Sequence, residues 1–281
     1  MGKLMIYGTT SSAGKSLLTT GLCRILSNKG YKVAPFKSQN MSRNYYKLSD
    51  GRVIAAAQVL QAKAARIDLD PRLNPLVLVP RETNGSDIYF MGEKVAYMKA
   101  KEYFAYKKDL GPKIKEIFDD LKEDYDVVVI EGAGSPAEIN LLENDFVNTG
   151  MAEIADCSCI LVTDINRGGA FAHLYGTVKI LNEKDAKRIK GFVINKFRGD
   201  KSLLASGIEE IERLTGVPVL GILDYKDYKL PDEDSLVDGK NERTFGNISE
   251  ELLDSELNRL AKDMEENLDM DKLMELMGLW F

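Results

Sequence analysis

One loop constrains this chain more than any other feature of its sequence. Residues 8–16 read GTTSSAGKS, between an apolar run, KLMIYG, and an amphipathic pattern that begins LLTTGLCRIL. Small residues let backbone N–H groups turn inward around phosphate oxygens, and the N-terminus of a following helix adds favourable partial charge. Lys15 can reach the terminal phosphates of a nucleotide, and Ser16 can ligate Mg²⁺. The sequence therefore predicts a strand, a phosphate-binding loop and a helix in that order.

The loop departs from the common spacing by one residue. Five residues separate Gly8 from Gly14 instead of four, so Thr9 stands where the first glycine usually lies. We expect the nucleotide to be bound by one continuous stretch: Thr10, Ser11, Ser12, Ala13, Gly14, Lys15, Ser16 and Leu17. The loop alone does not distinguish a kinase from a ligase or a nucleotide-controlled switch.

The rest of the chain alternates short apolar runs with helical patterns. We expect strands at 3–8, 31–36, 75–80, 126–132, 158–164, 191–197 and 217–223, and helices near 15–29, 52–66, 99–121, 148–155, 170–182 and 203–215. Continuous apolar strands separated by helices are typical of a parallel sheet covered on both faces. The predicted fold is α/β, a three-layer, mostly parallel, doubly wound sheet of the P-loop NTPase type with a C-terminal helical tail.

The chain divides into two parts by composition. Residues 1–235 are expected to form the nucleotide-binding domain, and residues 236–281 a linker with an amphipathic helical tail. The segment 224–247 is polar and rich in turn residues, which indicates a surface connection. Apolar residues beyond Ile248 recur at helical spacing. This helix either packs on its own domain or docks another subunit or domain.

Charge and composition exclude several classes of protein. The 38 basic and 44 acidic residues give a net charge of −6, which argues against broad nucleic-acid binding. The sequence has no run of about 18 apolar residues, so it predicts no membrane-spanning helix. The N-terminus enters a strand pattern directly, so no signal peptide is expected. With three cysteines and no disulfide framework, the expected location is cytoplasmic, with no nucleic-acid or membrane partner.

Polar residues follow two of the predicted strands closely. Glu131 ends the run DVVVIE, and Lys37 follows the run YKVAPF. Ligands of open α/β sheets bind at the carboxyl ends of the strands. We expect Glu131 to hold Mg²⁺ together with Ser16, and Lys37 to neutralise phosphate charge or hold an anionic substrate. Gln39 and Asn40 add neutral donors and acceptors nearby. The alternatives are a capping role for Glu131 and a solvated loop position for Lys37.

Two later strands also end in polar residues. Asp164 begins an Asp-x-x-Arg-Gly-Gly turn that contains Arg167. This turn either positions substrate or a second Mg²⁺, or is an ordinary salt-bridged turn. Asn195 and Lys196 end the strand GFVINK, where such a pair often contacts the nucleotide base. A capping role for Asn195 is the alternative.

The segments outside the loop carry a family resemblance. They read PFKSQNMSRN, AAAQVLQAKAA, NPLVLVP, EGAGSPAEINL, DINRGGAFAHLYGT, GFVINKFRGD and LTGVPVLGIL. From about residue 4 to about residue 235, the chain resembles the synthetase domain of the cobyric acid synthase family, which is related to dethiobiotin synthetase. EGAGSPAEIN and NKFRGD are far more specific to this family than the phosphate loop.

The resemblance implies an amide-forming ligase. Members of the family use ATP and Mg²⁺ to convert the b, d, e and g carboxylates of a corrinoid into acyl phosphates, and ammonia then displaces the phosphate. It implies catalytic roles for Lys15, Lys37, Glu131 and Asp145. The expected substrate contacts are Gln39, Asn40, Ser135, Asp164 and Arg167. A solvated loop acid is the alternative for Asp145.

The chain also departs from the family pattern. The family continues into a class I glutamine amidotransferase domain that releases ammonia with a cysteine nucleophile and a histidine. No such nucleophile loop is evident, and the sole histidine, His173, lies within the synthetase region. We therefore expect ammonia from a missing domain, a separate glutaminase subunit or free solution. The tail is one candidate surface for docking a glutaminase, and the sequence is compatible with a homodimer.

Two other functions remain open on the sequence alone. One is a dethiobiotin synthetase-like ligase that activates a different acid. The other is an ATPase switch of the ParA/MinD type, although those proteins often carry an extra lysine early in the loop, where this chain has TTSSA. The matches outside the loop favour the corrinoid ligase.

Overall fold

The computed structural model describes residues 1–82, 84–231 and 245–279. Its centre is a six-stranded sheet in the order β12-β11-β10-β1-β9-β2, and every neighbouring pair is parallel. The strands are β1 (Gly2–Gly8), β2 (Val33–Phe36), β9 (Val127–Glu131), β10 (Ser158–Asp164), β11 (Ile189–Phe197) and β12 (Val219–Asp224). The predicted mostly parallel sheet is confirmed.

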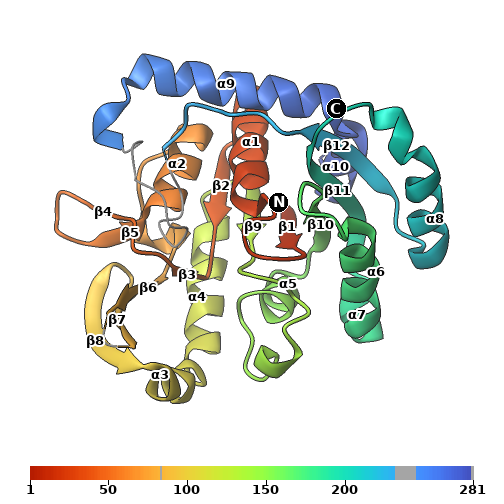
Figure 1. Ribbon diagram of the computed structural model, residues 1–281. Coiled ribbons are helices and arrows are strands. Elements are labelled where there is room, and N and C mark those ends of the chain that lie inside the picture. The colour runs from red at the N-terminus through yellow and green to blue at the C-terminus, as the bar shows by residue number, and fades with distance from the viewer. Residues whose placement is uncertain (83, 232–244, 280–281) are drawn as a thin grey trace.

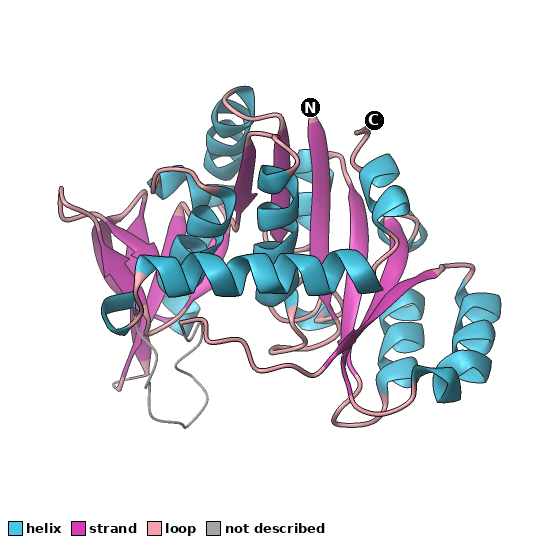
Figure 2. Cartoon of the chain, turned by 90° about the horizontal axis from the view of Figure 1, so that it is seen from above, coloured by secondary structure: helices cyan, strands magenta, loops and turns pink. Residues whose placement is uncertain are grey.

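Helices cover both faces of this sheet, which makes three layers (Figures 1 and 2). The first layer contains α1 (Lys15–Asn28), α9 (Glu250–Asn267) and α10 (Met270–Leu276). The second contains α4 (Leu110–Glu123), α5 (Thr149–Ala155), α6 (Ala170–Ile180) and α8 (Ala205–Thr215). Helix α2 (Ala56–Ala65) contributes to both, and α7 (Glu183–Ala186) is a short turn after α6.

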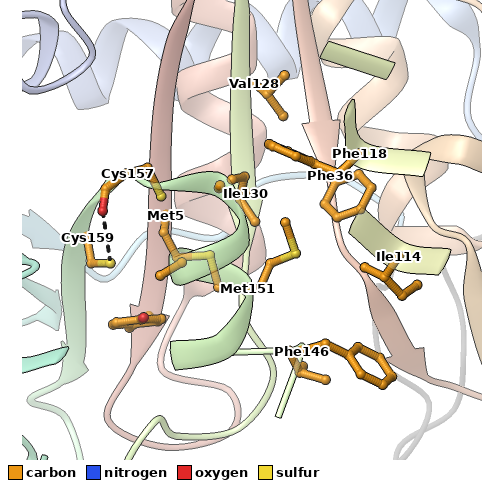
Figure 3. Close-up of a cluster of buried hydrophobic side chains, with 14 of the residues drawn as sticks. Met5, Phe36, Ile114, Phe118, Val128, Ile130, Phe146, Met151, Cys157 and Cys159 are labelled. Carbon is orange, nitrogen blue, oxygen red and sulfur yellow. Dashed lines mark hydrogen bonds between the residues drawn. The ribbon is translucent and has the colours of Figure 1, made fainter. Parts of the chain in front are cut away.

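The strands are apolar along their length because both of their faces are buried. In β1, Leu4 and Ile6 pack under the first helical layer, and Met5 and Tyr7 pack under the second. Figure 3 shows part of the second core, in which the rings of Phe36 and Phe118 meet edge to face with centroids 5.1 Å apart. The period of two in a strand thus sends alternate side chains into two separate cores.

A second, smaller sheet lies beside the main one and was not predicted. Its order is β3-β6-β7-β8, from β3 (Gln39–Met41), β6 (Leu76–Arg81), β7 (Gly85–Phe90) and β8 (Glu93–Lys99). A two-stranded ribbon, β4 (Tyr45–Lys47) with β5 (Val53–Ala55), accompanies it. The expectation that 75–80 joins the main parallel sheet is wrong. Strand β6 instead pairs antiparallel with β7, because a hairpin partner follows it directly in the chain.

Two predicted helices have different bounds in the structure. The helix expected at 99–121 is divided into α3 (Ala100–Lys107) and α4. Pro112 lies in the first turn of α4, where its missing N–H is tolerated, whereas the interior of one long helix would lose a hydrogen bond there. The helix expected at 52–66 begins only at Ala56, because β5 precedes it.

The C-terminal tail packs on its own domain. The apolar stripe of α9, which includes Leu253, Leu257 and Leu260, is buried against the layer that contains α1. Arg24 of α1 forms an ion pair with Asp254 of α9 at 2.7 Å. Any docked partner would therefore need a surface of the tail other than this stripe. The expected boundary at residue 235 and much of the polar segment 224–247 lie outside the described residues.

No helix in the described ranges is both long enough and apolar enough to cross a membrane. All three cysteines are buried and free.

Candidate active site

The phosphate loop has the predicted setting. Strand β1 ends at Gly8, and α1 begins at Lys15. Gly14 has a φ of 110°, and a Cβ built there would lie 1.9 Å from Nδ2 of Asn195, so no side chain fits at this position. The Lys15 ammonium donates to the carbonyl oxygens of Thr10 at 3.1 Å and Gly134 at 2.9 Å. It thus lies across the mouth of the loop, toward the segment that follows β9.

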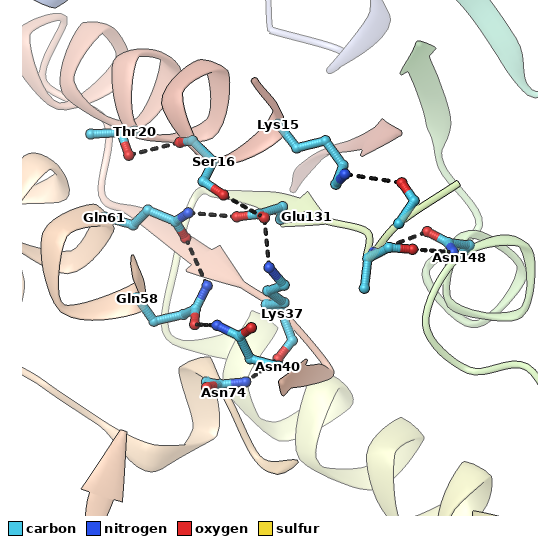
Figure 4. Close-up of polar contacts among 12 residues, drawn as sticks. Lys15, Ser16, Thr20, Lys37, Asn40, Gln58, Gln61, Asn74, Glu131 and Asn148 are labelled. Carbon is cyan, nitrogen blue, oxygen red and sulfur yellow. Dashed lines mark hydrogen bonds and ion pairs between the residues drawn. The ribbon is translucent and has the colours of Figure 1, made fainter. Parts of the chain in front are cut away.

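A buried carboxylate, Glu131, is the centre of the neighbouring polar cluster (Figure 4). Its Oε1 accepts from Ser16 Oγ at 2.8 Å and from Lys37 Nζ at 2.7 Å. Its Oε2 accepts from Gln61 Nε2 at 2.6 Å. The ends of β1, β2 and β9 are adjacent in the sheet, and this brings together residues that are far apart in sequence. The predicted grouping of Ser16, Lys37 and Glu131 is what the structure shows.

The electrostatics of the cluster keep Glu131 ionised. Burial by itself raises the pKa of this carboxyl, but the charge of Lys37 and the hydrogen bonds from Lys37, Gln61 and Ser16 together hold the pKa below its ordinary value. A buried carboxylate in this state is a ready ligand for a cation. This geometry agrees neither with a capping role for Glu131 nor with a solvated loop position for Lys37.

The donor set fits a magnesium ion. Mg²⁺ holds oxygen ligands at about 2.1 Å in an octahedron, so adjacent ligands lie about 3 Å apart. Ser16 Oγ and Glu131 Oε1 are 2.8 Å apart. A hydroxyl from the loop and a carboxylate from a neighbouring strand are also the oxygen types that suit this ion.

A chain of amides extends the cluster along α2. Asn40 Nδ2 donates to Gln58 Oε1 at 2.9 Å, and Gln58 Nε2 lies 3.5 Å from Gln61 Oε1. All three side chains are buried. The sequence alone did not predict a role for Gln58 or Gln61. The available signal was two glutamines three residues apart in an alanine-rich helix, where they share one face.

Two residues near the C-terminal end of β11 support the phosphate loop. Asn195 Nδ2 donates to the carbonyl of Ala13 at 2.9 Å, and Lys196 Nζ donates to the carbonyl of Ser12 at 2.6 Å. Lys196 also forms an ion pair with Asp164 at 2.9 Å. Asp164 therefore occupies a salt-bridged turn, which was one of its two interpretations. Contact of Asn195 and Lys196 with a base stays a prediction.

Asp145 is engaged in holding the start of α5. Its carboxylate accepts from the backbone N–H of Val147 at 2.8 Å, from the N–H of Gly150 at 3.0 Å and from Thr149 Oγ1 at 3.1 Å. The N–H of Asn148 also donates to it, at 3.1 Å. These contacts are typical of a residue that caps a helix start. These contacts explain Asp145 as a cap, so a catalytic role for this residue stays a prediction.

The segment after β9 is fixed by one amide that the sequence reasoning did not select. Asn148 Nδ2 donates to the carbonyl of Ala133 at 2.7 Å and to that of Ser135 at 3.3 Å. Asn148 Oδ1 accepts from the Ala133 N–H at 3.1 Å. Ser135 itself is buried, and its hydroxyl accepts from the N–H of Ala137. This segment carries Gly134, the acceptor of Lys15.

The remaining expected substrate residues are dispersed. Gln39 accepts a hydrogen bond from the Tyr103 hydroxyl and lines a cavity beside the small sheet. Arg167 is exposed in the turn after β10 and has no contact with the Glu131 cluster. The structure therefore brings Asn40 into the cluster, places Gln39 next to it and leaves Arg167 outside.

Comparison with known proteins agrees with this architecture. Residues 4–237 match the CbiA family model, described as the CobQ/CobB/MinD/ParA nucleotide binding domain. A cobyric acid synthase of Limosilactobacillus reuteri (strain DSM 20016) is 51% identical over 233 residues, 83% of this chain and 46% of that protein. The cobyric acid synthase of Streptococcus sanguinis (strain SK36) is 50% identical over 242 residues, 86% of this chain and 48% of the relative.

A third relative, the cobyric acid synthase of Listeria monocytogenes (strain ATCC BAA-679 / EGD-e), is 50% identical over 240 residues. That match covers 85% of this chain and 47% of the relative. The chain thus spans about half the length of the curated relatives it matches. With its phosphate loop, parallel sheet and family match, the chain belongs to the CbiA family of CobQ/CobB/MinD/ParA nucleotide-binding domains.

Proposed function

We propose that this chain is the ATP-dependent synthetase part of a cobyric acid synthase, which activates side-chain carboxylates of a corrinoid for amidation in cobalamin biosynthesis. The observation that carries the proposal is the Glu131 cluster. It sets a buried ion pair with Lys37, at 2.7 Å, directly beside the Ser16 hydroxyl of the phosphate loop. The identity of about 50% to cobyric acid synthases supports the choice of substrate.

The reaction has two steps. A carboxylate oxygen attacks the γ-phosphorus of ATP, the bond to the β,γ-bridging oxygen breaks, and ADP leaves with that electron pair. Ammonia then attacks the acyl carbon, inorganic phosphate leaves, and the nitrogen loses a proton to give the amide. The first step is needed because a carboxylate is a poor electrophile, and phosphorylation supplies a leaving group.

The residues of the site are suited to hold the phosphates. The backbone of the loop binds phosphate oxygens, and Lys15 provides positive charge at its mouth. Lys37 provides a second positive charge from the neighbouring strand end. Ser16 and Glu131 would hold Mg²⁺, which supplies charge neutralisation at the phosphates when bound. Gln61 keeps the Glu131 carboxylate in place through its second oxygen.

The source of ammonia is a separate part of the proposal. The relatives are about twice as long as this chain, and the family resemblance implies a class I glutamine amidotransferase domain. We propose that such a domain or a partner subunit delivers ammonia to this site, and that an ammonium salt substitutes for it in the test tube.

The test is phosphate release with Mg-ATP, an ammonium salt and cobyrinic acid a,c-diamide. Each conversion of a carboxylate into an amide lowers the product mass by about 1 Da. Lys15→Ala should lose most of the turnover, since removing one charge contact to the transferring group costs about 10²- to 10³-fold. Lys108→Ala, an exposed lysine of the same charge, is the control.

Phosphate release that does not depend on the corrinoid would refute the proposal. Slow hydrolysis accompanied by nucleotide-dependent dimerisation would favour a switch of the ParA/MinD type instead.

A further inference from the structure

A cavity outside the phosphate site is formed by the small sheet, α3 and the loop before α5. Its volume is about 370 Å³, within the range of about 300–1,000 Å³ that is usual for small-molecule sites. In Figure 1 this region lies where α3 meets β7 and β8. The wall is largely apolar, with polar groups at a few points; it includes Gln39, Ile88, Met98, Tyr103, Lys107 and Leu141. Such a cavity is suited to an apolar ligand that carries a few polar groups.

Lys107 is an unusual member of this wall. Only 8% of the residue is exposed. Across the described ranges its ammonium has no ion pair and no hydrogen bond, and it lies over the ring of Phe146, 4.9 Å from the centroid. Phe146 is itself fixed in the core shown in Figure 3. The structure therefore holds a buried cation at the cavity without an anionic partner in contact.

The energetics of Lys107 indicate that its ammonium lacks an anion in contact. Burial lowers the pKa of its ammonium below the ordinary value, and the more distant charge of Asp145 offsets this only in part. The other cation on the wall, Arg81, differs because it is ion-paired with Asp87. A carboxylate bound at Lys107 would supply the charge and the hydrogen bonds that burial has removed.

The mouth of the cavity is apolar on its outer side as well. Met41, Phe104 and Leu141 all line the cavity, and they are 46%, 49% and 40% exposed. Exposed apolar side chains around a concave site mark a ligand-binding surface. They would contact the face of a ring too large to enter the cavity completely.

The cavity is connected to the phosphate site through β3. Gln39 lines the cavity and accepts from Tyr103, whereas the next residue, Asn40, donates to Gln58 in the amide chain that leads to Glu131. Neighbouring residues of β3 thus face the cavity on one side and the nucleotide cluster on the other. Carboxylate activation requires the acid to reach the γ-phosphate, and a ring bound beside β3 lies near the cluster that would hold it.

We propose that this cavity binds one edge of the corrinoid ring and that the Lys107 ammonium binds one of its side-chain carboxylates. The proposal rests on the proposed function and adds to it the location of the substrate and the residue that anchors it. Lys107 is a binding residue in this scheme and takes no part in phosphoryl transfer.

The experiment measures binding of cobyrinic acid a,c-diamide to the full chain by calorimetry, without nucleotide, and then the KM values for the corrinoid and for Mg-ATP. Lys107→Met keeps the length of the side chain and removes the charge. Lys108→Met makes the same change at the adjacent, exposed lysine. Ser86→Phe adds bulk to the cavity from β7 and leaves both lysines unchanged.

Loss of one charged hydrogen bond should weaken corrinoid binding about 10- to 100-fold in Lys107→Met and raise the corrinoid KM similarly. The KM for Mg-ATP and the thermal midpoint should stay close to those of the Lys108→Met control. Lys107→Arg should recover part of the affinity, and Ser86→Phe should weaken binding as well.

Equal corrinoid binding by Lys107→Met and Lys108→Met would overturn the anchor, and unchanged binding by Ser86→Phe would overturn the cavity. In both cases the proposed function still holds if the wild-type chain amidates the corrinoid. A wild-type chain that binds no corrinoid refutes the proposed function, and the location of the substrate with it.

Discussion

Replacing Lys37 with methionine should destabilise the fold in a way that depends on pH. The ammonium lies 2.7 Å from Glu131 Oε1, and the two side chains are only 9% and 1% exposed. At an effective dielectric constant of about 20, this separation corresponds to about 6 kcal/mol of attraction. Part of that attraction offsets the cost of burying both charges. Removing one partner of a buried pair therefore costs about 3–5 kcal/mol.

The sign of the pH dependence follows from the pKa of Glu131. In the native chain burial raises this pKa, but Lys37 and the hydrogen bonds together hold it below its ordinary value. Its contribution to stability is thus present above the unfolded-state pKa and is lost as the pH falls through the folded-state pKa. Lys37→Met removes the charge and the hydrogen bond of Lys37, so we expect burial, the largest cause, to prevail and to raise the folded-state pKa of Glu131 above the unfolded-state value. The variant then gains stability as the pH falls between these two values, by up to about 1.4 kcal/mol per pH unit.

The assay is urea unfolding followed by far-UV circular dichroism at about pH 8 and about pH 6. The deficit of Lys37→Met relative to wild type should be larger at the higher pH. The double variant Lys37→Met/Glu131→Gln, which removes both charges of the pair, should recover most of the loss at both pH values.

A deficit of the same size at both pH values would refute this reasoning. A double variant whose loss equals the sum of the two single losses would refute it as well, because the two side chains would then not be coupled.

Three further predictions concern groups around the site. Gln61→Leu should lower kcat by about 10- to 100-fold, since the buried carboxylate loses a hydrogen bond; an unchanged kcat in steady-state phosphate release would contradict this. Gly14→Ala should lower the thermal midpoint more than Gly30→Ala, because both have positive φ but only the first meets a neighbour, Asn195; equal shifts would disprove the close approach. Asp145→Ala should cost about 1–2 kcal/mol of stability as a lost cap, whereas a loss of turnover without a loss of stability in urea would favour a direct chemical role.

The main sheet was predictable because its strands are buried on both faces. The expected strand at 158–164 has the same bounds as β10, and the run ending at Glu131 placed the carboxylate correctly at a strand end. The small sheet was not predictable in the same way. Strands β7 and β8 are partly exposed and are joined by a tight turn in which Met91 and Gly92 both have positive φ. Met-Gly is a weaker turn signal than Asn-Gly or Asp-Gly.

The site residues also differ in whether the sequence predicts them. Ser16, Lys37 and Glu131 follow strands directly, so the rule that ligands gather at strand ends placed them together. Gln61 lies inside a helix, and only the packing of α2 against the sheet directs its amide at Glu131. Asp145 shows the reverse case. Its sequence position suggested chemistry, but its backbone contacts depend on how the loop folds back on α5, which no local pattern reveals.

The central position of β1 has a consequence for how the protein is made. This first strand pairs with β9 and β10, so Leu4 has no neighbour in the sheet until residues 129 and 158 have been synthesised. Helix α9, which covers α1, is made later still. Folding on the ribosome therefore cannot complete the phosphate site when its loop emerges, because the strands on both sides of β1 are made later. Such long-range pairing slows folding and leaves apolar strands exposed in the meantime. The nascent chain should accordingly expose part of the apolar surface of this domain until α9 has left the ribosomal tunnel.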